Sequence, residues 1–155
     1  MSAFIPHDGP AADLTEIGNI DFFPDIRVAD FRAALKVVDA IPAPRVVWEL
    51  KRAMLATNRE LHTWRVAQAA AGIARLADMD TDMYGDEGAL TLHYLSAVYN
   101  RAKAFLIEKG RDIDVTNDGA DHAAFAEKTV EEHFRAVREA LAAILGRPDA
   151  MVELV

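Results

Sequence analysis

The stretch Asn58-Arg-Glu-Leu-His-Thr-Trp-Arg-Val-Ala-Gln-Ala-Ala-Ala-Gly-Ile-Ala-Arg-Leu-Ala-Asp78 decides the fold class of this chain. It contains no proline, and it is rich in alanine, which loses no side-chain entropy when it becomes helical. Upstream, apolar residues recur every three, four or seven positions from Val47 to Trp64. This spacing predicts one long helix over Ala43–Asp78, with Asn58 or Gly72 as possible kinks.

The alanine-lined face of this helix favours close packing against other helices. A glycine inside a helix costs about 1 kcal/mol relative to alanine, so we expect Gly72 to mark a close helix crossing. The predicted helix-packing residues on this stretch are Trp64, Gly72, Ile73 and Leu76.

Apolar residues at helical spacing predict three further helices: a short one over Val28–Asp39, then Asp86–Gly110 and Asp121–Leu145. Asp86 lies where negative charge suits a helix start, and Gly146 suits the residue after a helix end. The fold class predicted is therefore all-α, a helical bundle with three long helices and one short helix. The connections are short, so neighbouring long helices should run antiparallel.

The two ends of the chain are set apart from this bundle by turn residues. We expect residues 1–21 to form a flexible N-terminal arm, residues 22–146 the helical bundle domain, and residues 147–155 an extended C-terminal tail. Phe22 and Phe23 stand out as adjacent aromatics in a polar leader. They either staple the arm to the subunit's own core or anchor it in a groove of a neighbouring copy.

Composition narrows the class of protein. The chain has 155 residues, no cysteine and a formal net charge of −8. Disulfides and thiolate metal sites are excluded, and the negative charge argues against wrapping nucleic acid. The first residues lack the basic start and apolar run of a signal peptide, and no segment has the roughly 20 apolar residues of a membrane span.

We find no catalytic, metal-binding or cofactor-binding signature. A di-iron bundle needs Glu-x-x-His on two helices, and the sequence contains no such motif. An EF-hand loop starting at Asp78 would need glycine where Met83 stands and a carboxylate where Ala89 stands. The residues Asp78–Gly85 are therefore interpreted as a solvated acidic turn, and we expect no enzymatic activity.

Four segments, in this order and at this spacing, resemble the head completion/stabilisation protein (L protein) family of temperate contractile-tailed phages. They are Phe22-Phe-Pro-Asp-Ile26, Thr57-Asn-Arg-Glu-Leu61, Ala70-Ala-Gly-Ile-Ala-Arg-Leu-Ala-Asp78 and Gly146-Arg-Pro148. The resemblance implies a late structural protein of the virion that completes and stabilises DNA-filled heads and retains the packaged DNA. By analogy with head–tail adaptor or connector subunits, about twelve copies would form a ring under the portal.

The resemblance also implies the partners and the location. They are further copies of the chain in a homo-oligomeric ring, the portal protein, a tail-side connector or tail terminator protein, and packaged DNA that passes without sequence-specific binding, with no membrane. The protein would lie at the head–tail junction of the virion and in the host cytoplasm during assembly. Two alternatives stay open: a non-virion helical binding, regulatory or assembly-accessory module, and an unrecognised helical enzyme.

We expect both ends of the chain to make intermolecular contacts that become ordered on assembly, because each carries apolar side chains in a segment too short to fold alone. The alternating tail would add as a strand to a partner, and the aromatic pair would enter a hydrophobic groove. The predicted oligomer and portal contacts are Phe22, Phe23, Pro24, Ile26, Met151, Val152, Leu154 and Val155.

Overall fold

A computed structural model of the chain describes residues 15–79, 82–111 and 119–147. This part is mostly helical. Its helices are α1 (Val28–Leu35), α2 (Ala43–Glu60), α3 (His62–Ala70), α4 (Ala89–Arg111) and α5 (Gly119–Leu145), with a 3-10 helix η1 at Leu76–Met79. Two small two-stranded sheets accompany them, formed by β1 (Glu16–Ile17) with β2 (Ile26–Arg27) and by β3 (Met83–Tyr84) with β4 (Glu87–Gly88). The all-α class predicted from the sequence holds apart from these two hairpins.

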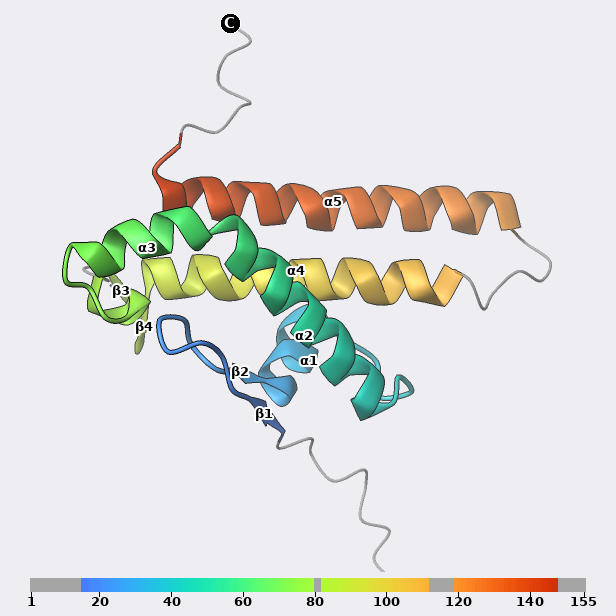
Figure 1. The fold of residues 1–155 in the computed structure, drawn as a ribbon. Helices are drawn as coiled ribbons and strands as arrows, with labels where there is room; N and C mark the ends of the chain where they lie inside the picture. The colour runs from blue at the N-terminus through green and yellow to red at the C-terminus, as the bar shows by residue number, and fades with distance from the viewer. Residues whose placement is uncertain (1–14, 80–81, 112–118, 148–155) are drawn as a thin grey trace, which may run out of the picture.

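The long helices form a crossed arrangement. Figure 1 shows α4 and α5 side by side and antiparallel, with α2 crossing α4 obliquely and α1 on the lower side of α4. The core lies where α1, α2 and α4 meet, and its fully buried side chains include Phe31, Leu50 and Tyr94. Arg101 of α4 also pairs with Glu60 at the end of α2, at 2.6 Å.

The folded unit begins earlier than predicted. Glu16 and Ile17 pair antiparallel with Arg27 and Ile26, and Ile17 is buried. The boundary that assigned residues 1–21 to a flexible arm is therefore wrong for the described residues 15–21. A two-residue strand leaves too short an alternation to be recognised in a sequence, because the pattern needs at least four residues.

The helix predicted over Ala43–Asp78 is three separate elements. The backbone at Leu61 departs from helical values, with φ −88° and ψ 0°, which divides α2 from α3. Helix α3 then ends at Ala70, and Gly72 adopts φ +90°. The amides of Gly72 and Ile73 donate to the carbonyls of Ala69 and Gln68, which is the Schellman arrangement of a helix end.

Gly72 consequently ends a helix instead of marking a close crossing, and a Cβ placed there would meet no atom within 4 Å. The prediction of a crossing at Gly72 was wrong because glycine serves a left-handed backbone as readily as a close approach. Leu76, predicted to pack from the same long helix, is fully buried but belongs to η1.

The other helix boundaries differ by a few residues from those predicted from the sequence. The short first helix ends at Leu35, four residues before the predicted Asp39, because Lys36 takes a left-handed conformation with φ 50°. Helix α4 begins at Ala89, since Glu87 and Gly88 form strand β4, and it runs past Gly110 to Arg111. Gly146, with φ 64°, ends α5 as predicted, and its neighbour Arg147 donates its amide to the carbonyl of Ala142.

Within the described residues, no helix combines the length and apolar character that a membrane span requires.

Candidate functional site

The segment Phe22–Ile26 is built into the subunit's own core. Phe22 and Phe23 are 5% and 4% exposed, and Ile26 is fully buried. The Phe23 ring stacks on Tyr94 of α4 with centroids 4.5 Å apart, and Phe22 meets the edge of Trp64 at 6.0 Å. The carbonyl of Phe22 accepts a hydrogen bond from the amide of Leu76 at 2.9 Å, which ties the segment to η1 as well.

A polar network holds the same segment from its other side. Asn19 donates to the hydroxyl of Tyr94 at 2.8 Å and to the carbonyl of Pro24 at 2.8 Å. The Tyr94 hydroxyl donates in turn to Asn58 at 2.6 Å, and Asn58 donates to Asn19 at 2.9 Å. Burial raises the pKa of Tyr94 well above its usual range, so this hydroxyl stays protonated and keeps its role as a donor.

These contacts correct the expectation that the aromatic pair anchors in a neighbouring copy. Of the two interpretations left open by the sequence, the structure shows the staple on the subunit's own core. The rings of Phe22 and Phe23 cannot fill a partner's groove without leaving stacked contacts inside this subunit. Pro24 is half-buried, and its carbonyl is engaged by Asn19.

Helix α3, unlike the Phe22–Ile26 segment, contributes no buried residue to the core. Its Val66 side chain is 47% exposed. The predicted helix-packing residues Trp64 and Ile73 are half-buried and pack against the edge of the core. Alanine-rich α3 therefore covers the core incompletely, and a hollow lies along each of its sides.

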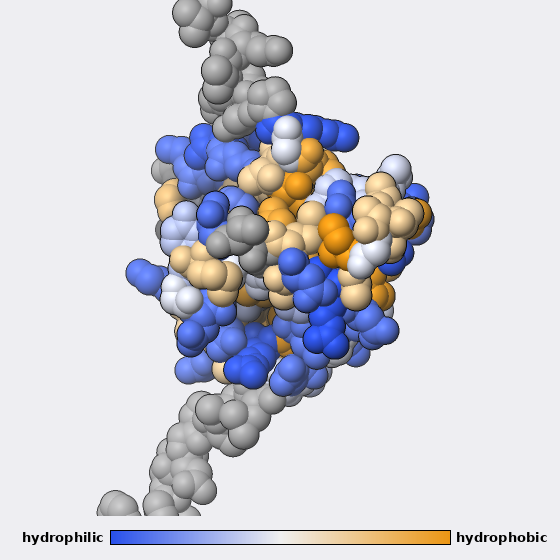
Figure 2. Space-filling model, turned by 90° about the vertical axis from the view of Figure 1, so that its left-hand side faces the viewer, coloured by the Kyte–Doolittle hydropathy of each residue, from blue (hydrophilic) through white to orange (hydrophobic). Residues whose placement is uncertain are grey.

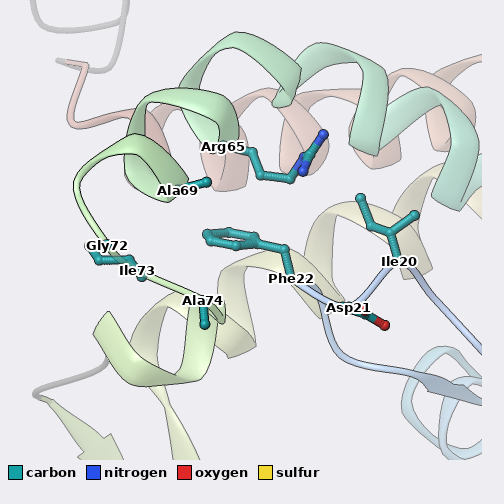
Figure 3. A pocket seen from close by; sticks show the side chains of 8 residues that line it. All are labelled: Ile20, Asp21, Phe22, Arg65, Ala69, Gly72, Ile73 and Ala74. Atoms are coloured by element: carbon teal, nitrogen blue, oxygen red, sulfur yellow. The ribbon is translucent and has the colours of Figure 1, made fainter.

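The first hollow, which we call the Phe22 cleft, measures about 450 Å³ and separates α3 from the leader. Figure 3 shows the Phe22 ring projecting toward Ala69, with the Arg65 side chain extended above it and Ala74 below. Its lining residues are Ile20, Asp21, Phe22, Arg65, Ala69, Gly72, Ile73 and Ala74. A single arginine and a single aspartate on an apolar wall offer no catalytic geometry.

The second hollow, which we call the α3–α5 groove, is larger, at about 820 Å³. It runs between α3 and the last turns of α5, with apolar side chains along it and charged ones among them. Its lining residues are Glu60, Thr63, Trp64, Ala67, Arg138, Leu141, Ala142, Leu145 and Arg147. Figure 2 faces this end of the molecule and shows apolar surface gathered in its upper half, at the height of α3 and α5, above a mainly hydrophilic lower half.

Other apolar side chains are exposed away from α3. Trp48 and Leu55, 63% and 72% exposed, stand seven positions apart on α2 and so share its outer face. Met83 and Tyr84 are exposed on strand β3.

The polar groups between α4 and α5 serve packing. His133 donates from Nδ1 to Asn100 Oδ1 at 2.8 Å, and burial together with nearby Lys103 lowers the pKa of His133.

A second polar contact joins α2 to α4. Buried Glu49 pairs with Arg52 at 2.6 Å, and the Arg52 guanidinium lies 4.5 Å from the centre of the Phe105 ring. In the described part of the chain, no three His, Asp or Glu side chains gather as a metal site would require.

The sequence interpretation missed both hollows, because it treated α3 as part of one continuous packed helix. The signal available was the concentration of alanine from Ala67 to Ala74, which supplies little side-chain volume to cover a core. The expected contact residues Met151, Val152, Leu154 and Val155 lie outside the described residues.

Comparison with known proteins adds what this geometry leaves open. The profile of the phage head completion protein (GPL) family matches residues 17–155. The chain is also 34% identical to the head completion/stabilization protein of Escherichia phage P2 over 146 residues, which cover 94% of this chain and 86% of the relative. This chain belongs to the phage head completion protein family. No solved structure matches it significantly.

Family membership confirms the resemblance derived from the four sequence segments. Head completion proteins are structural proteins of phage heads, so a virion-associated role follows for this chain. The matched region begins at Ile17, within strand β1.

Proposed function

We propose that this chain completes and stabilises DNA-filled phage heads as a non-enzymatic ring subunit, placed under the portal, that retains the DNA and prepares the vertex for the tail. The observation that carries this proposal is the family match over residues 17–155, together with 34% identity to the phage P2 protein. The name of that relative states the role in head completion and stabilisation that we extend to this chain. The ring, the portal and the tail-side partner are our extension.

The apolar surfaces of the subunit support a ring. In a head-to-tail ring every interface is heterologous, so one surface of a copy meets a different surface of the next. The chain offers exposed apolar surfaces on different elements, including the α3–α5 groove and the Trp48–Leu55 face of α2. Exposed apolar surface of this kind is typical of protein–protein contact sites.

The charge of the chain supports a place beside packaged DNA. A formal net charge of −8 repels phosphate, so a channel lined by this protein would let DNA slide without binding it. The partners proposed are therefore further copies of the chain, about twelve in number, the portal protein on one side and a tail-side connector or tail terminator on the other.

Deletion of the gene from its phage tests this function directly. We expect heads that package DNA but lose it to nuclease, or that fail to accept tails, and rescue of both by the intact gene supplied in trans. The purified wild-type particle should contain the chain, detected by mass spectrometry.

Two results would overturn the proposal. Particles lacking the chain that retain DNA through nuclease challenge and join tails normally would remove the role in head completion. Absence of the chain from wild-type particles would favour the accessory module that never enters the virion.

A further inference from the structure

The α3–α5 groove has the chemistry of a site for an extended peptide. Its apolar side chains are Trp64, Ala67, Leu141, Ala142 and Leu145. Arg138 and Arg147 also line the groove, but Arg138 already pairs with Glu131 at 2.7 Å. Its carboxylate, Glu60, is likewise paired with Arg101 at 2.6 Å, so the positive character that the groove presents to a ligand rests on Arg147.

The segment of this chain beyond Arg147 has the complementary chemistry. It reads Pro148-Asp-Ala-Met-Val-Glu-Leu-Val155 and contains four large apolar residues and two acids, with no basic residue. In an extended conformation Ala150, Val152 and Leu154 share one face, and Asp149 and Glu153 share the other. The apolar face can lie on Trp64 and Leu141 while the acidic face stays within reach of the long Arg147 side chain.

We propose that, in the ring proposed above and resting on that function, the segment Asp149–Val155 of each copy binds the α3–α5 groove of the next copy. Tail and groove are different surfaces of one chain, which is what a heterologous interface requires. The stretch of α5 from Arg138 to Leu145 is about 11 Å long at 1.5 Å per residue, and the seven residues Asp149–Val155 span about 20 Å when extended, so the tail can cover it.

Gly146 and Pro148 set how the chain leaves the end of α5. Gly146 turns the chain in a Schellman arrangement at the end of α5. Arg147 precedes Pro148, and a residue before proline is confined to extended conformations. Because Arg147 itself lines the groove, the same copy's groove is the competing site, and the trapping experiment below distinguishes the two.

Disulfide trapping can test this inference cleanly because the chain contains no cysteine. The trapping variant carries Ala67→Cys in the groove and Val155→Cys in the tail, and it leaves both arginines, Leu154 and Glu153 in place. The matched control carries Ala124→Cys with Val155→Cys. Ala124 is also an exposed alanine, but it lies near the opposite end of α5.

Both variants are assembled into phage particles, oxidised mildly and separated on a non-reducing gel. We expect a ladder of covalent multimers from Ala67→Cys with Val155→Cys and a single-chain band from the control. A single-chain band in which both thiols resist alkylation would place the tail in its own groove. Free, alkylatable thiols would place the tail elsewhere, and either result overturns the proposal.

Mixing two purified single variants, Ala67→Cys and Val155→Cys, separates this inference from the proposed function. A covalent dimer at high protein concentration supports tail exchange even when the chain is missing from particles, whereas its absence opposes exchange. Reversing one charge, with Arg147→Glu or with Glu153→Arg, should lower the dimer yield about two- to fivefold, as expected for an exposed ion pair. Combining the two reversals should restore the yield, and no recovery would show that this pair does not form.

Discussion

The Phe22–Ile26 segment and helix α3 lie against each other, yet they relate to the core in opposite ways. The segment is short and irregular, and its Phe22, Phe23 and Ile26 are all buried. Helix α3 is regular and nine residues long, and it buries none of its residues. The difference follows from side-chain size, because an aromatic ring buries about 150–250 Å² whereas alanine buries little.

Regular secondary structure is therefore a poor guide to how firmly a segment is held in this protein. The irregular segment is fixed by ring stacking and by a closed set of hydrogen bonds through Asn19, Asn58 and Tyr94. The regular helix leaves a hollow on each side. We expect the first region to contribute to the stability of the subunit and the second to its contacts with other molecules.

The largest effect should come from removing a ring of the segment. Phe23→Ala leaves a cavity beside Tyr94, and we expect the free energy of unfolding to fall by about 3–5 kcal/mol. Urea denaturation followed by circular dichroism measures the loss. Val66→Ala on α3 is the matched control, since Val66 is 47% exposed and its truncation should change stability by less than about 0.5 kcal/mol. Equal losses in both variants would show that the segment is no better anchored than α3.

A smaller loss should follow from breaking the polar network while keeping the ring. Tyr94→Phe removes the hydroxyl that Asn19 and Asn58 share, which leaves two half-buried amides short of a partner. We expect a loss of about 1–3 kcal/mol in the same denaturation experiment. Tyr84→Phe, at a tyrosine that is 66% exposed, should be silent. A silent Tyr94→Phe would mean that water replaces the hydroxyl.

These two regions also mark how far the sequence could predict the fold. Helical spacing located all the long helices, because stripes of large apolar residues such as Val130, Val137 and Leu141 fall on one face of a 3.6-residue period. It failed between Leu61 and Leu76, where alanine satisfies a helical pattern whether or not the chain stays helical. The end of α3 depends on the left-handed backbone at Gly72, and glycine in a sequence does not reveal which of its uses applies.

The candidate site was less predictable than the fold. Phe22 and Phe23 were recognised as unusual, but the choice between their own core and a neighbour depended on Tyr94, which lies more than seventy positions away in sequence. The α3–α5 groove is formed by residues of α2, α3 and α5 and the turn after α5. No local sequence pattern indicates that these elements lie together in the fold. Family membership, in contrast, was available from four short segments because it needs order and spacing and no three-dimensional contact.

The end of α3 offers a test that acts on the backbone alone. Gly72→Ala places a Cβ in open space at φ +90°, so only the left-handed conformation opposes the change. We expect a loss of about 1–2 kcal/mol, seen as a lower melting temperature. Gly110→Ala, which also meets no atom within 4 Å but has no positive φ, should show no loss. A stable Gly72→Ala would show that α3 can extend through this position, as the sequence pattern alone predicts.

The smallest effect should be a gain, at the end of α1, where the same kind of turn is made without glycine. Lys36 takes φ 50°, and the amide of Val37 donates to the carbonyl of Arg32 at 3.0 Å, as the amide of Ile73 does to Gln68 after α3. A left-handed conformation costs a residue with a Cβ about 1–2 kcal/mol. Glycine avoids this cost, but it loses more conformational entropy on folding, which offsets part of the gain in stability. Lys36→Gly should therefore raise the free energy of unfolding by about 0.5–1 kcal/mol. Lys36→Ala separates backbone from side chain, since it removes the charge but keeps the strain, and its stability should stay near that of the parent. Should alanine stabilise the protein as much as glycine does, the charge of Lys36 and not its backbone would be the source of the gain.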